Sequence, residues 1–364
     1  MKNLGIYIHI PFCAKKCPYC DFFSVSYSKE LVLKYTDAVI RNLIYYGNSE
    51  NIIDTVYFGG GTPSLIPADC IERILDALNV NFKVSENPEI TIEVNPNTVN
   101  SQKLRDFYNM GINRLSVGVQ SLVPSELITL GRTHTAEKAV NTVTDAVNVG
   151  FRNISCDMMI GVAGQNIDNI GYTIEKLSEL PVTHISSYIL KIEENTAFNT
   201  PDIINSLPDD DYISDMYLFM VSALEKKGFI QYEVSNFAKS GFQSIHNNKY
   251  WKCEDYLGIG TSSHSCFGNK RFAVKPDIKS FIKSPVQDIY VTDENPCGKK
   301  EYAMLRLRLK EGLEIYGKRF SYPEIIPKIQ NLINAGYINF DEKKISLTPE
   351  GYLISNSIIE YLIF

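Results

Sequence analysis

Short apolar runs alternate with longer amphipathic stretches up to about residue 190. The short runs predict six buried strands, at residues 5–10, 55–58, 90–94, 114–119, 153–160 and 184–190. The stretches between them have apolar residues at helical spacing and predict helices, such as 68–78, 101–110, 136–149 and 169–180. Six strand–helix units in succession are typical of a parallel α/β sheet wrapped by helices, open or barrel-like. In such folds ligands bind at the carboxyl ends of the strands.

The pattern changes beyond residue 190. It predicts a helix at 212–227, a strand at 231–234 and an irregular aromatic segment at 246–264. From residue 299 it predicts two helices, a hairpin and a closing helix, at 301–309, 322–335, 337–346 and from Thr348. Helices followed by a hairpin resemble a winged-helix module. We therefore expect a core domain at 1–235, a connecting segment at 236–298 and a smaller α+β module at 299–364.

Composition and charge exclude several classes of protein. The chain has 364 residues, a length that suffices for a barrel-sized domain and a smaller module. Of these residues, 44% are hydrophobic and 21% are charged. Its formal net charge of -6 gives no basic field for a nucleic acid backbone, so we expect no nucleic-acid partner. No apolar run has the length of a bilayer span, and the first residues lack a signal-peptide pattern. We therefore expect a cytoplasmic location.

Three cysteines form the most informative motif. Cys13, Cys17 and Cys20 follow the first predicted strand with C-x3-C-x2-C spacing. Iron–sulfur clusters are normally held by four cysteines, and structural zinc also takes four ligands. Three thiolates would leave one metal position open for another ligand. The alternatives are a zinc site with His9 as the fourth ligand, or three unrelated thiols. The other cysteines, at 70, 156, 253, 266 and 297, are scattered and are interpreted mostly as buried thiols.

Further candidate residues follow the predicted strands. The glycines at 59–61 follow one strand and allow either a tight turn or the close approach of backbone to a ligand. Ionisable or polar side chains stand at or near the ends of other predicted strands: Glu93, Gln120, Arg132 and Asp157. Burying such side chains is costly unless they are paired. Their shared placement at one rim predicts a ligand with ammonium and carboxylate groups.

The aromatic segment gives a separate set of candidates. It contains His246, Tyr250, Trp251 and His264, and Trp251 is the only tryptophan in the chain. Aromatic side chains with a nearby imidazole could line a flat macrocycle pocket in which a histidine is an iron ligand. The alternative is a loop whose aromatic side chains cover the mouth of the barrel.

Taken together, these motifs resemble those of the radical S-adenosylmethionine (SAM) superfamily. The resemblance rests on residues 7–13, Cys17, Cys20 and residues 59–64, and it covers nearly the whole chain. More narrowly, the chain resembles the branch of that superfamily that contains oxygen-independent coproporphyrinogen III oxidases and HemW haem chaperones. This resemblance implies a partial (βα)6 TIM-like barrel, and a [4Fe-4S] cluster held by the three cysteines. In this family the amino and carboxylate groups of SAM chelate the fourth iron.

Two features distinguish the two activities of that branch. The oxidases carry a further cysteine two residues after the third cluster cysteine, where this chain has Phe22. Residues 246–251 match the H-N-x-x-Y-W signature of the chaperones. The resemblance therefore implies a protein that binds haem and delivers it to apo-haemoproteins, with no catalytic residue assigned. The alternative function is oxidative decarboxylation of coproporphyrinogen III.

The resemblance also implies particular ligands and partners. The positions that match SAM contacts are Tyr7, Tyr19, Gly60, Gly61, Thr62, Glu93, Gln120, Arg132 and Asp157. The implied partners are an electron donor for the cluster and an unknown apo-haemoprotein acceptor, with membrane respiratory enzymes among the candidates. Peripheral association with a membrane and a homodimer are compatible with the resemblance. Residues 158–165 and 260–265 depart from the usual family pattern, which leaves the shape of the pocket near Asp157 and His264 open.

Overall fold

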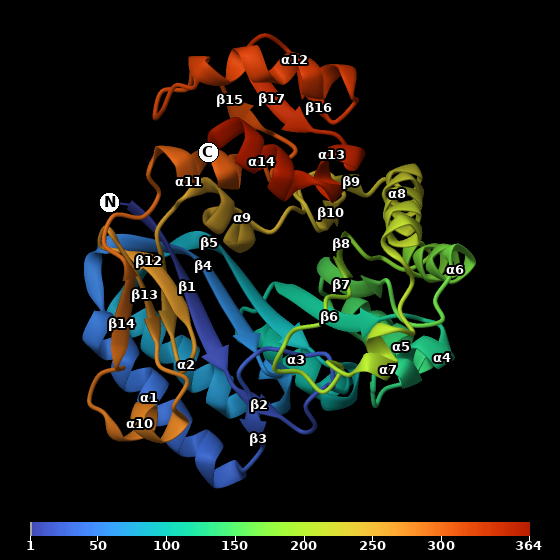
Figure 1. Ribbon diagram of the computed structural model, residues 1–364. Coiled ribbons are helices and arrows are strands. Elements are labelled where there is room, and N and C mark those ends of the chain that lie inside the picture. Colours follow the sequence, from blue (N-terminus) through green and yellow to red (C-terminus); the bar gives the residue numbers. More distant parts are fainter. Residues whose placement is uncertain (1) are drawn as a thin grey trace.

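The computed structural model describes residues 2–364 and contains a strongly curved sheet of twelve strands (Figure 1). Its strand order is β14-β13-β12-β11-β1-β4-β5-β6-β7-β8-β10-β9. The strands are β1 (Lys2–Ile10), β4 (Asn48–Gly60), β5 (Phe82–Val94), β6 (Arg114–Gln120), β7 (Asn153–Ile160), β8 (His184–Ile189), β9 (Ile230–Gln231), β10 (Asn236–Ala238), β11 (Tyr256–Ile259), β12 (His264–Phe267), β13 (Lys270–Val274) and β14 (Ile289–Asp293).

The six predicted strands are confirmed as β1, β4, β5, β6, β7 and β8, which are parallel neighbours in chain order. Each connection returns to the adjacent strand, and the sheet curls into part of a barrel with helices outside (Figure 1). The helices of this part are α1 (Lys29–Tyr46), α2 (Ala68–Asn81), α3 (Ser101–Asn109), α4 (Pro124–Thr129), α5 (Ala136–Val149), α6 (Ile167–Ser178), α7 (Pro201–Ile204) and α8 (Asp210–Lys226). The predicted helices at 68–78, 101–110, 136–149, 169–180 and 212–227 are thus confirmed.

The prediction of an irregular segment at 246–264 is wrong. Residues Ile245–Lys252 form helix α9, and the following β11 pairs in parallel with β1, with Gly5 opposite Tyr256. Strands β12 to β14 continue the sheet beyond β11 in antiparallel pairs. Local sequence could not indicate this pairing because the partner strand lies at the other end of the chain. The strand predicted at 231–234 is also shorter, since only Ile230–Gln231 is extended as β9.

The C-terminal unit contains the predicted helices and hairpin. Its sheet has the order β15-β17-β16. Helix α10 (Ile278–Lys283) lies beside α1 on the outside of the barrel. The C-terminal unit consists of α11 (Lys299–Arg306), β15 (Leu313–Glu314), a 3-10 turn at Pro323–Ile325, α12 (Ile326–Asn334), β16 (Ile338–Phe340), β17 (Lys344–Leu347), α13 (Pro349–Leu353) and α14 (Ser355–Ile363). This unit lies beyond the amino-terminal ends of the barrel strands, next to α9 (Figure 1). One hydrophobic core runs continuously from the barrel into this unit.

Within residues 2–364, no helix has both the length and the apolar composition that crossing a bilayer requires.

Candidate cluster and cofactor site

The inner face of the barrel is polar. Along β6, the polar Arg114 and Ser116 alternate with the apolar Leu115 and Val117, all of them buried, because successive side chains of a strand point to opposite faces. The inward side chains are joined across strands: the Tyr57 hydroxyl donates to Glu93 Oε1 at 3.1 Å. The barrel therefore encloses a polar interior rather than a purely apolar one.

The three cysteines of the motif lie on a loop at the carboxyl ends of the strands. Cys13 belongs to β2 (Phe12–Cys13), which pairs with β3 (Val25–Ser26) and so closes the loop at its base. Within it, the Cys20 N–H donates to the Cys17 carbonyl at 3.1 Å. All three thiols are free and partly exposed. The loop therefore presents its thiols without using them in disulfides.

This cysteine loop packs against a segment that follows β8. Tyr19 lies against Phe198 with ring centroids 6.1 Å apart, and the Phe198 N–H donates to the Pro18 carbonyl at 3.1 Å. On another side, a side chain at Gly131 would meet the Pro18 ring at 2.8 Å. Glycine is therefore required at 131, where φ is +65°, for the loop to approach the segment that carries Arg132.

The glycine-rich end of β4 fits against the same loop. Gly60 has a φ of +112°, and a Cβ there would come within 2.5 Å of the His9 ring. The Gly61 N–H donates to the Ile10 carbonyl at 2.9 Å, and the Thr62 N–H donates to the Phe12 carbonyl at 2.8 Å. These contacts support both sequence interpretations, since the glycines form a tight turn and also bring the backbone close to the cysteine loop.

Two other contacts join the thiols to the strand ends. The Cys13 sulfur lies 3.6 Å from the Thr62 hydroxyl oxygen, and Arg132 Nη1 donates to the Cys17 sulfur at 3.5 Å. The structure thus places residues from three separate sequence motifs around one rim, as the sequence predicts for the carboxyl ends of the strands. Tyr19 also lies beside Arg132, which opposes the rise in the tyrosine pKa caused by burial.

Burial shifts the pKa of both carboxyl groups below this rim. Burial, followed by the nearby Asp157, raises the pKa of Glu93 to about 8, although hydrogen bonds from Tyr57 and the Gly60 N–H oppose the shift. Burial raises the pKa of Asp157 to about 6, and the Ser116 hydroxyl, which donates at 3.0 Å, opposes it. Two desolvated carboxyl groups in one interior are stabilised when a cation binds between or beside them.

Arg132 and Gln120 complete the rim. Arg132 donates from Nη2 to the Gly118 carbonyl at 2.9 Å, whereas its buried Nε has no partner among the described residues. Gln120 ends β6 with a φ of +69°, a left-handed conformation that is uncommon outside glycine and often marks a functional position. A free guanidinium N–H next to a partly buried rim is suited to binding an anionic group such as a carboxylate.

The structure does not support His9 as a fourth ligand of a zinc ion. Its Nδ1 lies 3.1 Å from the Tyr7 hydroxyl and its Nε2 lies 3.2 Å from the Phe23 carbonyl, so both ring nitrogens have partners. In the described part of the chain, no three His, Cys, Asp or Glu side chains converge as ligands of one metal ion. An iron–sulfur cluster does not require ligands that converge on one metal ion, because each of its cysteines binds a different iron.

The candidate haem residues are divided between two places. His246 and Tyr250 lie on α9 at the amino-terminal ends of the barrel strands, away from the cysteine loop (Figure 1). His246 is fully buried: its Nδ1 lies 2.8 Å from the Thr55 hydroxyl and its Nε2 2.8 Å from the Tyr250 hydroxyl. Burial lowers the pKa of His246 to about 3. Both nitrogens are therefore occupied in this conformation.

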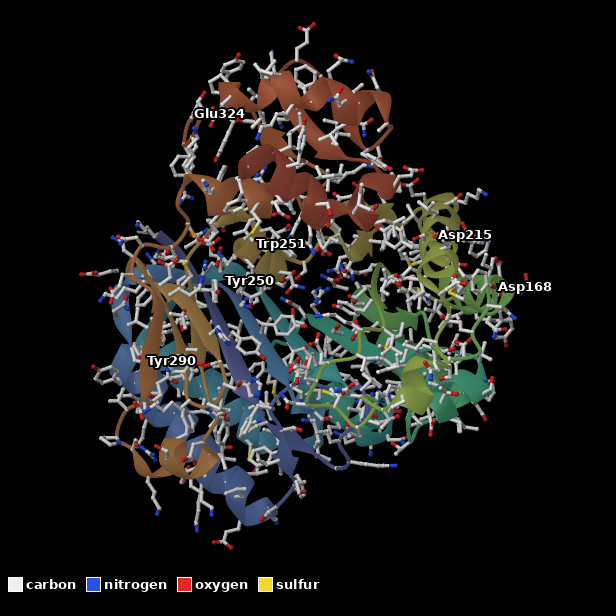
Figure 2. All side chains as sticks on the ribbon, viewed as in Figure 1. Asp168, Asp215, Tyr250, Trp251, Tyr290 and Glu324 are labelled. Carbon is white, nitrogen blue, oxygen red and sulfur yellow. The ribbon has the colours of Figure 1, made fainter. Side chains whose placement is uncertain are left out.

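The other two haem candidates are more accessible. Trp251 is partly buried and lies on α9 beneath the C-terminal unit, beside Tyr250 (Figure 2). His264 begins β12 with an exposed side chain and lies close enough to His9 to affect the pKa of that residue. His264 is thus on the rim side of the barrel, unlike the other three candidates.

Sequence reasoning missed Arg114 and Tyr57. Arg114 is 1% exposed, its Nε has no partner among the described residues, and its charge opposes the raised pKa of both Glu93 and Asp157. The signal that could have found these residues is the period of two in their strands. That period predicts a polar inward face, whereas an apolar run by itself does not distinguish the two faces of a strand.

Comparison with known proteins agrees with this geometry. Residues 7–177 match the model of the radical SAM superfamily. The chain is 32% identical to the heme chaperone HemW of Lactococcus lactis, covering 99% of this chain and 97% of that protein. It is likewise 32% identical to the heme chaperone HemW of Escherichia coli, covering 99% and 98%.

A solved structure shares the fold. The coproporphyrinogen III oxidase (HemN) of Escherichia coli, described as a radical SAM enzyme, superposes with a TM-score of 0.81. The match covers 100% of this chain and 90% of the oxidase at 20% identity. At that identity the likeness establishes a common fold and not a common reaction.

Proposed function

This chain belongs to the HemW haem chaperone family of the radical SAM superfamily, and on that basis we propose that it binds haem and delivers it to apo-haemoproteins. In this proposal it also carries a [4Fe-4S] cluster ligated by SAM. The observation that carries the proposal is the meeting of the cysteine loop with Thr62 and Arg132 at one rim. Oxidation of coproporphyrinogen III is the less favoured function, since Phe22 replaces the additional cysteine and is 67% exposed.

Cys13, Cys17 and Cys20 would hold three irons of the cluster, which supplies an electron and one open iron position when bound. Their thiols fit this role because they are free, partly exposed and carried on one loop. Arg132 would neutralise part of the negative charge of the cysteine ligands through its hydrogen bond to the Cys17 sulfur.

The residues below the loop would bind SAM. Glu93 and Asp157 would favour its positively charged sulfonium group, because a nearby cation lowers the cost of ionising both carboxyl groups. The free Nε–H of Arg132 would bind its carboxylate. The remaining proposed contacts line the same rim or the adjacent barrel interior; they are Tyr7, Tyr19, Gly60, Gly61, Thr62 and Gln120.

Haem is the cargo rather than a resident group. We propose His264 as its first candidate ligand, since its imidazole is exposed on the rim side of the barrel. Ligation by His246 would require α9 to move, because both of its ring nitrogens are hydrogen-bonded. Tyr250 and Trp251 would then serve as flanking aromatic contacts on the same helix. An apo-haemoprotein and an electron donor are the proposed partners, and the proposed site of action is the cytoplasm or the membrane surface.

The experiment that tests this function begins with anaerobic reconstitution of the full chain with iron and sulfide. The protein is then incubated either with haem and SAM or with coproporphyrinogen III and SAM. Absorption spectra report bound haem, and chromatography reports porphyrin products. Stable haem binding without decarboxylated product supports the chaperone function. Formation of protoporphyrinogen would instead make this protein an oxidase without the usual additional cysteine.

A further inference from the structure

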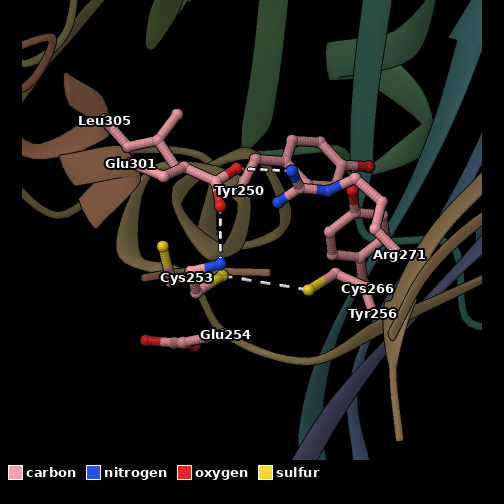
Figure 3. Close-up of a pocket in the computed structure, with 9 residues that line it drawn as sticks. Tyr250, Cys253, Glu254, Tyr256, Cys266, Arg271, Glu301 and Leu305 are labelled. Atoms are coloured by element: carbon pink, nitrogen blue, oxygen red, sulfur yellow. Dashed lines mark hydrogen bonds and ion pairs between the residues drawn. The ribbon is translucent and has the colours of Figure 1, made fainter. Parts of the chain in front are cut away.

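Three cysteines that are scattered in the sequence meet at a second site. Cys253, Cys266 and Cys297 line a cavity of about 200 Å³ together with Tyr250, Arg271 and Glu301 (Figure 3). The sulfur atoms of Cys266 and Cys297 are 3.9 Å apart. Cys253 lines the same cavity and lies close enough to Cys297 for each thiol to shift the pKa of the other. Cys297 is therefore the central thiol of the three, which we call the thiol cluster.

The thiol cluster lies where three parts of the fold meet. Cys253 caps the end of α9, Cys266 lies in β12, and Cys297 directly precedes α11. Cys253 and Cys297 have φ values of +54° and +64°, so both are in left-handed conformations that side chains other than glycine seldom adopt. Their placement therefore depends on the surrounding structure and not on local preference.

An ion pair fixes one side of this arrangement. Glu301 on α11 pairs with Arg271 on β13, and it also accepts a hydrogen bond from the Cys297 N–H (Figure 3). The carboxylate thus links the sheet, the C-terminal unit and the central cysteine. The three thiols are held at the junction of these elements rather than on a free loop.

The chemistry of the three thiols differs. Cys253 is partly exposed, and its proximity to Cys297, assisted by nearby Arg319, lowers its pKa. The buried Cys266 has a raised pKa because of the neighbouring Cys297 and because of burial. Since the thiolate is the nucleophile in thiol–disulfide exchange, Cys253 is the thiol best suited to attack a molecule that enters the cavity.

We propose that the thiol cluster is a thiol–disulfide exchange site whose substrate is a small-molecule disulfide. The Cys253 thiolate attacks one sulfur of R–S–S–R, forms a mixed disulfide and releases RS⁻, which takes up a proton. Cys297 then attacks the Cys253 sulfur, releases the second RSH and closes a Cys253–Cys297 disulfide. In sum, two protein thiols lose two electrons and two protons, and the small disulfide gains them as two thiols.

Cys266 can continue the exchange. As the Cys266 sulfur attacks the Cys297 sulfur, the Cys266 proton passes to the Cys253 sulfur that leaves; a Cys266–Cys297 disulfide forms and Cys253 returns to the thiol state. The 3.9 Å separation places the Cys266 and Cys297 sulfurs in contact, so forming a bond of about 2.05 Å requires only a small approach. The first disulfide joins α9 to the start of α11, whereas the second joins β12 to the same point. Exchange would therefore change which part of the barrel is tied to the C-terminal unit.

The test uses the full chain with its iron–sulfur cluster reconstituted under anaerobic conditions. The protein is equilibrated with glutathione buffers of increasing oxidised fraction, quenched with acid, alkylated and mapped by peptide mass spectrometry. We expect two alkylatable thiols per chain to be lost, with Cys253–Cys297 or Cys266–Cys297 peptides appearing while the iron content stays constant. Individually alkylated Cys253, Cys266 and Cys297 at the most oxidising ratio would overturn the proposal. Persistent glutathione adducts without an internal link would overturn it as well.

Variants sharpen this result. Cys297→Ser should prevent both internal disulfides, because Cys297 is the shared partner, whereas Cys266→Ser should leave only Cys253–Cys297. Cys70→Ser is the matched control, since it removes a buried cysteine on α2 outside the thiol cluster. If Cys297→Ser does not fold, the disulfide-linked peptides found in the wild-type chain and in Cys266→Ser still test the proposal. A metal ion that is retained by Cys70→Ser and lost from Cys266→Ser would overturn the proposal in favour of a metal site.

Discussion

Arg132 Nη1 donates a hydrogen bond to the sulfur of Cys17 at 3.5 Å, although the two residues are 115 positions apart in the sequence. The same guanidinium donates to the Gly118 carbonyl at 2.9 Å and so connects the cysteine loop to the end of β6. Hydrogen bonds between charged groups contribute about 1.5–3 kcal/mol each. Arg132 is therefore expected to stabilise the loop in the charge state in which its thiolates bind iron.

Replacing Arg132 with lysine should weaken retention of the cluster. Lysine keeps a positive charge but cannot bridge Cys17 and the Gly118 carbonyl with a planar guanidinium. Loss of one charge-assisted hydrogen bond, worth about 1.5–3 kcal/mol, corresponds to a roughly ten- to hundredfold change in an equilibrium. The measurement is the equilibrium iron content of the reconstituted protein against increasing chelator concentration. Arg152→Lys is the control, since Arg152 is exposed and donates only to nearby backbone carbonyls. Equal chelator resistance of both variants would contradict this role.

Binding of SAM should depend on the ionisation of Glu93. Burial raises the pKa of Glu93 to about 8, and a bound cation favours the ionised carboxylate. Apparent affinity should therefore rise as the pH increases from about 6 and should level off above about 8. Glu93→Gln should bind SAM roughly ten- to hundredfold more weakly at pH 8, because it lacks a charged partner worth about 1.5–3 kcal/mol. Anaerobic equilibrium dialysis across this pH range measures both effects.

The control for Glu93 is Glu86→Gln, which changes an exposed carboxylate on the same strand. The amino group of SAM itself titrates near this range. Comparing the wild-type and Glu93→Gln profiles removes that common contribution. If apparent SAM affinity changes with pH at the same rate in the wild type and in Glu93→Gln, Glu93 does not provide the charge that SAM recognises.

Much of the barrel could be predicted from the sequence, because its strands and helices depend on local periodicity. The placement of α9 could not, since His246 is fixed by Thr55 on β4 and its backbone N–H by Glu89 on β5. In the sequence, an imidazole near aromatic residues is compatible with an open ligand pocket. Only the fold shows that β4 and β5 surround His246 and occupy its hydrogen-bonding capacity.

The same limit applies to the cysteines. The spacing of Cys13, Cys17 and Cys20 indicates a common site because one short loop must bring them together. Cys253 and Cys297 meet only because the four strands and one helix between them return the chain to one place. Sequence separation gave no reason to group them, and long-range sheet pairing is the physical cause of their proximity.

His246→Leu should destabilise the fold. The substitution leaves the Thr55 and Tyr250 hydroxyls without their buried partner, and each unsatisfied group costs about 1–3 kcal/mol. Denaturant unfolding at neutral pH should show a loss of about 2–4 kcal/mol. His264→Leu is the matched control, because that imidazole is exposed and its removal should leave stability nearly unchanged. Equal stability of the two variants would show that the buried hydrogen bonds of His246 contribute little.

The cost of His246→Leu should shrink in acid. The buried imidazole has a pKa of about 3, so the folded protein keeps it neutral while the unfolded chain takes up a proton below about pH 6.5. The contribution of His246 to the free energy of unfolding is therefore fully present above pH 6.5. It falls by about 1.4 kcal/mol per pH unit towards pH 3. Unfolding curves of both proteins at pH 7.5 and pH 5 measure the change. A stability difference that stays constant or grows at pH 5 would contradict the neutral, buried state of His246.

The cysteine loop and haem capture should be separable. Replacing Cys13, Cys17 and Cys20 together with alanine should abolish the iron–sulfur chromophore, because these residues provide all three proposed cluster ligands. Haem binding should persist, since His264 lies on β12 and not on that loop. Absorption titration with haem measures the second effect, and His264→Leu in the otherwise native chain should show the converse: an intact cluster and weaker haem binding. Cys156→Ala is a control for removal of a thiol, because Cys156 is buried in β7 away from the rim. If the triple variant remains folded and loses haem as well as the cluster, capture depends on the cluster itself, and the assignment of His264 as an independent ligand is wrong.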